Sequence, residues 1–333
     1  MKKTITILTF VLLTILAAGG IFFYGQSQPK SLGKITLGWN TWPGNLPYLV
    51  AYEQGFFKEQ GLEMEMIAEE SYLKKVDDLI SGKIDFSGDM ALVDVVEKAS
   101  KGGKLNVVLA TDYSNGADGI VAKKEIKNIS EFKGKKVAAE VGTLGEYLLY
   151  DALKKNNLEL SDVQEVNLSA QEAAQAFIRG EVDAAVTYEP DYSQAVEKGA
   201  GWRIYTSAES PGLIIDVLTF KSDFVAKNPA KVSAVVKSYF KAIDFIAANP
   251  DKAYEIGAKY FKITPSEFEE QIAGIKQLGL DDNQKMMSYG TGTGSLHGLI
   301  QQAYNFLQKK GTMKEKIDST EIIEPRFIKE LNK

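Results

Sequence analysis

The sequence predicts an α/β protein with two lobes, each a mixed sheet flanked by helices, and with two crossings of the chain between the lobes. Three observations support this fold. Short apolar strands alternate with helical segments along residues 34–220, as they do in βαβ units. The segment Gly82–Asp85 recurs as Gly180–Asp183, and each copy is followed by an apolar strand, an acidic residue and a helix. The last third of the chain is predicted to be helical.

The recurring segment has two explanations. An internal duplication produces it directly, but a glycine turn before an apolar strand also recurs by chance in α/β proteins. In either case, two units of the same kind favour two similar lobes that face one cleft.

The predicted strands share runs of apolar, β-branched or strictly alternating residues. In order they are Lys34–Trp39, Leu62–Ile67, Ile84–Ser87, Leu105–Thr111, Gly119–Ala122, Lys135–Ala139, Val163–Leu168, Ala184–Thr187, Trp202–Tyr205 and Leu213–Phe220. The predicted helices share glycine, proline or capping residues at their ends. They are Pro47–Gly61, Ser71–Ile80, Ala91–Ser100, Gly145–Leu153, Gln171–Arg179, Tyr192–Lys198, Ala230–Ala248, Asp251–Phe261, Pro265–Gln271, Leu296–Gln308 and Pro325–Leu331.

The regular alternation breaks at two places, which we interpret as hinge crossings. The first is the polar stretch Asp112–Asp118, and the second is the strand Leu213–Phe220. Lobe 1 is therefore expected to contain residues 34–115 and 217–333, and lobe 2 residues 116–216. Two crossings of this kind allow lobes to close over a ligand.

Residues 1–33 are expected to be an export signal and a linker. Lys2 and Lys3 precede Ile5–Tyr24, which contains no charged residue, as in secretory signals. Ala17–Gly19 offers a cleavage site, but the apolar run reaches the ~20 residues that span a bilayer. A retained signal-anchor is slightly favoured over a cleaved peptide. Both place the rest of the protein in the periplasm or on the outer face of the cytoplasmic membrane.

The composition argues against several classes of function. The chain has no cysteine, which excludes a disulfide scaffold, a thiolate metal site and a cysteine nucleophile. His297 is the single histidine, so a catalytic triad or a two-histidine metal site is not expected. The net charge of −5 disfavours nucleic acid as a partner. We expect a monomer that is not an enzyme and needs no cofactor.

Candidate ligand contacts lie at the strand ends, because open α/β sheets bind ligands beyond the carboxyl ends of their strands. Trp42 and Asn45 belong to the loop after the first strand, and Ser87 and Asp89 follow the third. Each also has a structural alternative: Trp42 can pack on its own lobe, and Asp89 can cap the following helix.

The other candidates follow later strands or lie at the crossings. They are Asp112, Tyr113, Gly142, Thr143, Tyr188, Glu189 and Asp216. Asp112 can instead cap a hinge turn, and Gly142 with Thr143 can simply begin a helix.

Several motifs resemble those of ABC-importer solute-binding proteins of the nitrate, sulfonate, taurine and thiamine-pyrimidine-precursor group (NMT1/THI5-like). They are Pro47–Phe57, Gly61–Glu65, Ser81–Asp85, Phe132–Val137, Gly142–Thr143, Gly180–Ala184 and Glu189–Pro190. The resemblance covers residues 34 to about 248. It implies the type II periplasmic-binding-protein fold, a small-molecule ligand and an importer permease as partner. It places ligand contacts on Asn45, Ser87–Asp89, Asp112, Gly142–Thr143, Tyr188–Glu189 and Asp216.

The candidate contacts are rich in carboxylates, and the chain has only three arginines. Arginine is the usual planar partner of anions, and buried carboxylates without donors are costly. We therefore expect a cationic or nitrogen-rich ligand rather than a sulfonate. Two alternatives stay open: a ligand-sensing receptor domain, and a pyrimidine-synthase-like enzyme of the same fold, which relies on histidine and cysteine residues that this chain lacks.

Overall fold

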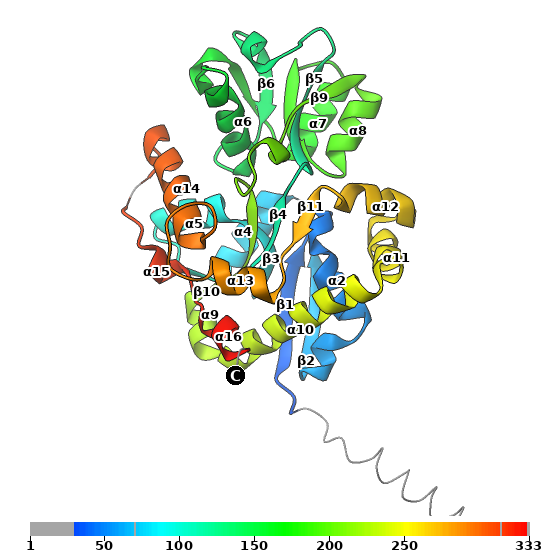
Figure 1. Cartoon of the computed structure of the whole chain (residues 1–333), viewed down its shortest axis with the longest axis vertical. Helices are drawn as coiled ribbons and strands as arrows, with labels where there is room; N and C mark the ends of the chain where they lie inside the picture. The colour runs from blue at the N-terminus through cyan, green and yellow to red at the C-terminus, as the bar shows by residue number, and fades with distance from the viewer. Residues whose placement is uncertain (1–29, 70, 314, 332–333) are drawn as a thin grey trace, which may run out of the picture.

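The computed structural model describes residues 30–69, 71–313 and 315–331, and these residues form two separate sheets. Each sheet with its helices makes one lobe, and the two lobes are stacked end to end (Figure 1). We call the lobe with six strands lobe 1 and the lobe with five strands lobe 2. The predicted two-sheet α/β architecture is confirmed.

The sheet of lobe 1 has the order β11-β4-β10-β3-β1-β2. Its strands are β1 (Gly33–Trp39), β2 (Leu62–Ala68), β3 (Phe86–Ala91), β4 (Leu105–Ser114), β10 (Ile215–Lys221) and β11 (Ile275–Gln277). Strand β1 is parallel to β2 and β3, whereas β10 is antiparallel to both β3 and β4. The sheet is therefore mixed, as predicted.

The sheet of lobe 2 has the order β7-β6-β8-β5-β9. Its strands are β5 (Asp118–Lys123), β6 (Lys136–Ala139), β7 (Gln164–Asn167), β8 (Ala184–Tyr188) and β9 (Gly201–Thr206). Strand β6 is parallel to β7 and β8, and β5 is antiparallel to β8 and β9. Each sheet thus has a strand next to a hinge crossing that is antiparallel to both of its neighbours: β10 in lobe 1 and β5 in lobe 2.

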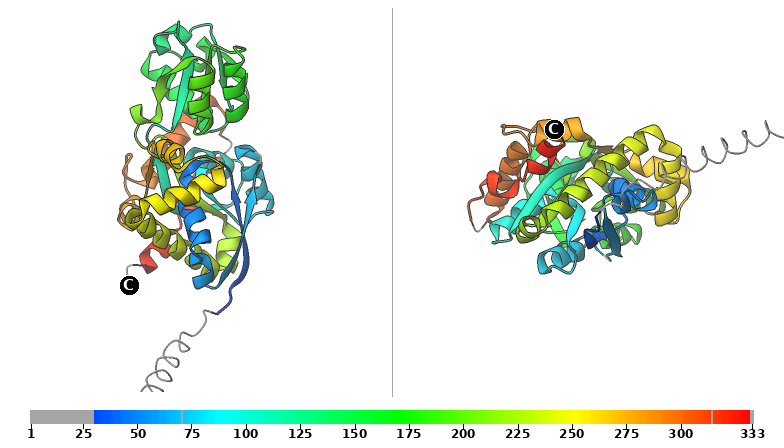
Figure 2. Two further views of the ribbon diagram at one scale, coloured as in Figure 1. Left: turned by 90° about the vertical axis from the view of Figure 1, so that its right-hand side faces the viewer. Right: turned by 90° about the horizontal axis from the view of Figure 1, so that it is seen from below.

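Helices cover both lobes (Figures 1 and 2). Lobe 1 has η1 (Pro43–Asn45), α2 (Leu46–Glu53), α3 (Phe56–Glu59), α4 (Tyr72–Ser81), α5 (Leu92–Ser100), α9 (Ser222–Lys227), α10 (Pro229–Ala248), α11 (Pro250–Phe261), α12 (Pro265–Ile272), α13 (Leu280–Met286), α14 (Leu296–Lys310), α15 (Ser319–Ile322) and α16 (Arg326–Glu330). Lobe 2 has η2 (Ile129–Phe132), α6 (Leu144–Lys155), η3 (Leu160–Asp162), α7 (Ala170–Ile178), α8 (Asp191–Lys198) and η4 (Ser207–Glu209).

The core of lobe 2 follows from the alternation of side chains along its strands. Neighbouring residues of a strand face opposite sides of a sheet. Val121 of β5 packs with Phe177 of α7 and Tyr192 of α8, whereas Ile120 belongs to the other hydrophobic cluster, together with Leu148 of α6. Both faces of the sheet are therefore buried, and the strand ends are left for the cleft.

The two crossings are hydrogen-bonded to each other. The Ser114 and Ser207 hydroxyl groups are 2.7 Å apart, and the Gly116 N–H donates to Ser207 Oγ at 2.8 Å. Strand β10 already pairs in the sheet of lobe 1 at Ile215 and Asp216, so the expected boundary between residues 216 and 217 falls inside a strand. The division into domains at these positions stays a prediction.

Helix α14 connects lobe 1 to lobe 2 away from the crossings. The Phe306 ring lies 4.7 Å from the Tyr147 ring and 4.9 Å from the Tyr150 ring of α6. Lys310 of α14 forms an ion pair with the buried Glu146 of α6. These contacts join the lobes in the conformation described here.

Four local predictions differ from the structure. Strand β4 continues through Tyr113 to Ser114 because β10 pairs with Asp112 and Tyr113 on one side and β11, which was not predicted, pairs with residues 112–114 on the other. Strand β3 continues to Ala91, so Asp89 is a strand residue and does not cap α5. Helices α9, α13 and α15 were not predicted. The first predicted helix is divided at Gly55, which has a φ of 75°.

The predicted signal segment lies in residues 1–29 and so falls outside the described residues. Within the described ranges, no helix has the length and the apolarity that a membrane crossing requires.

Candidate functional site

Two adjoining hollows lie at the strand ends between the lobes. The first is lined by Asn40, Trp42, Tyr72, Asp89, Asp118, Leu144, Tyr188, Ile214 and Asp216. The second is lined by Asp118, Glu140, Thr143, Leu144, Gly145, Ala170, Val186, Thr187 and Tyr188. Neither is a large enclosed cavity, because the roughly 260 Å³ and 280 Å³ of space outside protein atoms include open solvent. Because the two hollows share three residues, they form one cleft.

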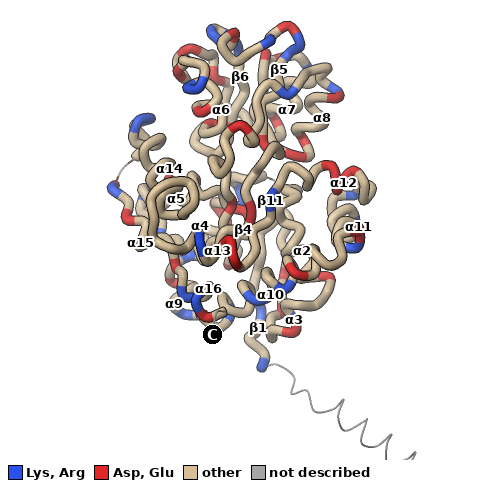
Figure 3. The backbone as a smooth tube through the Cα atoms, viewed as in Figure 1, with Lys and Arg blue, Asp and Glu red and all other residues tan. Residues whose placement is uncertain are grey.

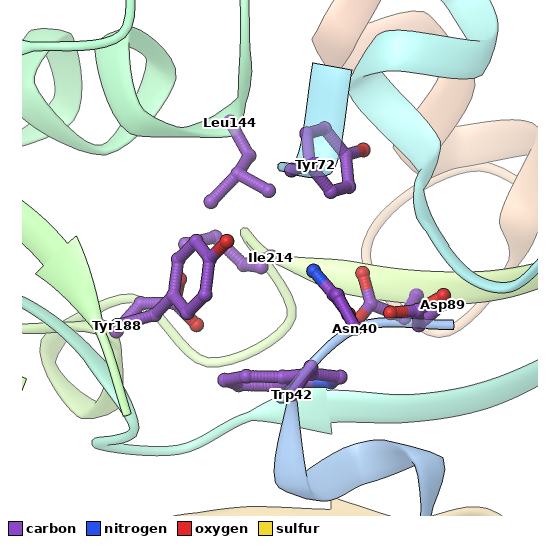
Figure 4. A pocket seen from close by; sticks show the side chains of 9 residues that line it. Asn40, Trp42, Tyr72, Asp89, Leu144, Tyr188 and Ile214 are labelled. Atoms are coloured by element: carbon purple, nitrogen blue, oxygen red, sulfur yellow. The ribbon is translucent and has the colours of Figure 1, made fainter. Parts of the chain in front are cut away.

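Aromatic rings from both lobes surround the first hollow. Trp42 of lobe 1 and Tyr188 of lobe 2 meet edge to face, with ring centroids 5.7 Å apart and planes at 86°. Figure 4 shows Tyr72 across the hollow from Tyr188, and Leu144 on the side opposite Trp42. Ring faces carry partial negative charge and attract cations, so these walls suit a cationic or flat ligand.

A buried ion pair lies behind the aromatic walls. Lys75 Nζ is 2.5 Å from Asp89 Oδ2, and both residues are buried, at 0% and 3% exposed. Asn45 Nδ2 donates to the same oxygen at 3.0 Å, and Ser87 Oγ donates to Asp89 Oδ1 at 3.1 Å. Asn45 and Ser87 therefore position Asp89, and Lys75 neutralises it.

Sequence reasoning missed Lys75, although one signal was present. Tyr72, Val76 and Leu79 mark the buried face of α4, and Lys75 shares that face by helical spacing. A lysine on an apolar helix face needs a buried partner, and Asp89 is that partner.

Asp112 lies beneath Trp42 and is fully buried. Neither of its carboxyl oxygens has a hydrogen bond of acceptable geometry among the described residues, and the Trp42 indole nitrogen has no partner either. Burial raises the pKa of Asp112 to about 8, with the charge of Asp89 as the next cause, while Thr111 and Trp42 oppose the shift. Asp112 is thus expected to be largely protonated at neutral pH.

Asp216 lies directly across from Asp112 in the β10–β4 pair. Burial raises the pKa of Asp216 well above its usual value, and the neighbouring Asp112 and Asp89 raise it further. Two facing carboxyl groups cannot both ionise without a counter-charge, so a cationic group in the first hollow would favour their ionised forms.

Lobe 2 contributes two more carboxyl groups. Burial raises the pKa of Asp118 to about 7, with the charge of Glu189 as a smaller cause. Burial also raises the pKa of Glu140 to about 7, followed by the charge of Glu172. The cleft therefore has ionisable acids on both sides.

The predicted site residues fall into three groups. Trp42, Asp89, Tyr188 and Asp216 line the first hollow, and Thr143 lines the second. Asn45, Ser87 and Asp112 lie behind the lining and support it. Tyr113, Gly142 and Glu189 line neither hollow.

The residues of the third group are engaged elsewhere. Glu189 accepts hydrogen bonds from the Ser193 N–H at 3.1 Å and from Arg203 at 3.0 Å. The Gly142 N–H donates to Glu146 at 2.7 Å. The Tyr113 ring lies 5.4 Å from Lys276 Nζ.

A family model described as "NMT1/THI5 like" matches residues 42–253, which is more than half of the chain. The chain belongs to the NMT1/THI5-like family. A binding protein of Brucella abortus is 25% identical over 276 residues, covering 81% of this chain and 83% of that protein. The taurine-binding periplasmic protein of Escherichia coli is 28% identical over 191 residues, covering 56% of this chain and 58% of that protein.

Solved structures share the fold of this NMT1/THI5-like chain. The periplasmic aliphatic sulphonate-binding protein SsuA of Escherichia coli matches with a TM-score of 0.70 at 19% identity, over 88% of this chain and 92% of that one. The periplasmic nitrate-binding protein NrtA of Synechocystis matches with a TM-score of 0.72 at 15% identity, over 91% and 89%. The predicted periplasmic-binding-protein fold is thus confirmed.

The family also contains enzymes, so possible catalytic groups matter. A 4-amino-5-hydroxymethyl-2-methylpyrimidine phosphate synthase of Saccharomyces cerevisiae is 27% identical over 230 residues, covering 64% of this chain and 66% of that protein. In this NMT1/THI5-like chain, His297 lies in α14 with its Nδ1 2.7 Å from Ser319 Oγ, outside both hollows. Among the described residues, no three His, Asp or Glu side chains converge to hold a metal ion.

Proposed function

We propose that this protein is an exported solute-binding protein that captures a small cationic or nitrogen-rich molecule between its lobes and delivers it to an ABC importer. The family and the fold support the solute-binding role, because relatives and structural neighbours include periplasmic binding proteins for taurine, sulphonates and nitrate. The candidate cleft has ligand-facing walls from both lobes, so a bound ligand would favour closure.

One observation favours a cationic ligand over an anion. The first hollow combines three aromatic side chains with the carboxyl groups of Asp118 and Asp216, and the adjacent cation, Lys75, is already paired with Asp89. A sulfonate or nitrate ion would meet unpaired acids here and no free guanidinium. An ammonium or amidine group would instead supply the hydrogen-bond donors that these acids lack.

Native mass spectrometry of the purified protein, followed by thermal-shift and calorimetric titrations, tests the proposal. Primary amines, amidines and aminopyrimidines are compared with taurine, an alkanesulfonate and nitrate. A ligand at 100 times its dissociation constant stabilises the folded protein by about 2.7 kcal/mol, which raises the melting temperature measurably. We expect the nitrogenous compounds to do so and the anions not to. Tight binding of an alkanesulfonate with none of the nitrogenous compounds would refute the ligand class.

An enzyme of the same fold is the less favoured function. The synthase relative supports it, but His297 lies outside the cleft, and acid–base chemistry would depend on carboxyl groups alone. A ligand-sensing receptor would use the same cleft in the same way. Growth of a deletion strain on the identified ligand, with uptake of the labelled compound, distinguishes import from sensing.

Export, retention by the N-terminal segment and a monomeric state belong to the same proposal. The periplasmic relatives support export. Cell fractionation of the full chain and size-exclusion chromatography with light scattering test the three statements separately.

A further inference from the structure

The second hollow has the features of a separate subsite. Its polar side chains all come from lobe 2: Asp118 begins β5, Glu140 follows β6 and Thr187 belongs to β8. The Thr187 hydroxyl is only 2% exposed and has no hydrogen-bond partner, and Asp118 Oδ2 has none either. Buried polar atoms are nearly always paired, so these two atoms indicate a partner that comes from a ligand.

Glu140 adds an uncompensated acid to this subsite. No lysine or arginine of the described ranges forms an ion pair with it, and its residue exposure is only 7%. The Thr143 hydroxyl donates to the Glu140 backbone carbonyl at 2.8 Å and not to its carboxyl group. A buried carboxylate without a cation is costly, and a ligand cation would remove that cost.

Apolar side chains lie between Glu140 and the acids of lobe 1, while Asp118 belongs to both hollows. Leu144 and Tyr188 belong to both hollows, and Val186 extends the apolar wall of the second. Asp216 lies in the first hollow, on the lobe 1 side. The lining of the cleft therefore runs from an acid of lobe 1, past apolar residues, to an acid of lobe 2.

Building on the proposed function, we infer that the ligand carries two amino groups joined by a hydrocarbon chain. One ammonium group lies among the aromatic rings of the first hollow beside Asp216. The hydrocarbon chain passes Leu144 and Tyr188. The other ammonium group lies in the second hollow, where Glu140 and Thr187 accept its hydrogen bonds. A monoamine fills the first hollow only and leaves the second without a donor.

The test compares linear diaminoalkanes, from diaminobutane to diaminooctane, with n-alkylamines of the same carbon number, by calorimetry on the full-length protein. We expect one diamine length to bind at least about tenfold tighter than its monoamine, since every tenfold step is about 1.4 kcal/mol. Glu140→Gln should remove most of that difference and leave the monoamine unchanged. Glu181→Gln, which alters an acid paired with Arg179 outside the cleft, is the matched control and should change neither.

Thr187→Val provides a second variant that keeps the β-branched shape and removes only the unpartnered hydroxyl. It should weaken diamine binding by a few fold and spare the monoamine. If diamines and monoamines bind equally, or if Glu140→Gln weakens the binding of both alike, the proposal of a ligand with two amino groups is refuted. A cationic ligand for the first hollow remains compatible with either result. If neither class binds, the diamine proposal is refuted as well, and the amidines and aminopyrimidines of the earlier comparison decide separately whether the ligand class of the proposed function stands.

Discussion

Replacing Lys75 by methionine should destabilise lobe 1 strongly. The change leaves the Asp89 carboxylate buried, with the Asn45 amide and the Ser87 hydroxyl as its remaining partners. Removing one member of a buried ion pair typically costs about 3–5 kcal/mol. Because two hydrogen bonds remain, we expect the lower end, about 3 kcal/mol. That is a large share of the roughly 5–15 kcal/mol by which a folded protein is stable.

Equilibrium urea unfolding, followed by far-ultraviolet circular dichroism, measures this loss as a fall in the transition midpoint at unchanged slope. Lys227→Met is the matched control. Lys227 of α9 also forms an ion pair in lobe 1, with Asp223, but both side chains are exposed, at 74% and 60%. Exposed pairs contribute little, so its midpoint should equal that of the unmodified protein.

The double variant Lys75→Met, Asp89→Asn separates the charge from the packing. It removes the uncompensated carboxylate, so it should recover a substantial part of the lost stability. If Lys75→Met shifts the midpoint no more than Lys227→Met, or if the double variant is less stable than Lys75→Met, Asp89 is not the charge that Lys75 neutralises.

Three further predictions concern the cleft and the contact between the lobes. Since the pKa of Asp112 is raised to about 8 in the folded protein, its contribution to stability is complete below its unfolded value of about 3.9 and is lost as the pH rises to about 8. Urea midpoints of the ligand-free protein should therefore fall over this range, and less steeply in Asp112→Asn. A Cβ at Gly44 would lie 2.7 Å from Asp112 Oδ2 and would clash with the Trp42 ring. Gly44→Ala should therefore weaken ligand binding about tenfold or more. Gly294 has open space around it, so Gly294→Ala should leave ligand binding unchanged. Phe306→Ala removes the ring that packs against α6 and should shift the ligand-free protein towards an open form. Small-angle scattering would show this shift as a larger radius of gyration. Gln301 is exposed on α14, the same helix as Phe306, so Gln301→Ala should leave the radius of gyration unchanged.

Each of these predictions has an outcome that would contradict it. A midpoint that is independent of pH, or a slope that Asp112→Asn does not alter, would mean that Asp112 is ionised in the folded protein. If Gly44→Ala and Gly294→Ala bind the ligand with equal affinity, the Trp42 loop does not contact the ligand. An unchanged radius in Phe306→Ala would show that other contacts hold the lobes together.

Local sequence patterns were sufficient for most of the fold, because most strands and helices carry their own signals. The apolar strand β8 and the alternating strand β2 were predicted almost to their ends. Strand β11 could not be predicted in this way. It has three residues and forms only by pairing with residues 112–114, and no short window of sequence contains both partners. The same pairing adds Ser114 to β4, and together with the pairing to β10 it makes Asp112 a strand residue and not a turn residue.

The candidate site was predictable at the level of strand ends but not of side-chain direction. Trp42, Asp89, Tyr188 and Asp216 reach the cleft as expected. Glu189 was expected there as well, but Ser193 and Arg203 hold its carboxylate on the other side. Which way a side chain points after a strand ends depends on partners that the fold supplies.

The insertion of β10 between β3 and β4 has a consequence for biosynthesis. Lobe 2, whose strands lie between residues 118 and 206, is made after β4 and before β10. Its sheet can therefore form from contiguous chain as soon as that chain is available, whereas the sheet of lobe 1 stays in two halves until residue 221 has followed. During this interval β3 and β4 expose unpaired edges, which invite pairing with other chains. Figure 3 shows acidic and basic positions interspersed over both folded lobes. Strands β3 and β4 themselves carry one charged residue each, Asp89 and Asp112, so charge gives these edges little protection, and we expect nascent chains to depend on a holding chaperone until β10 arrives.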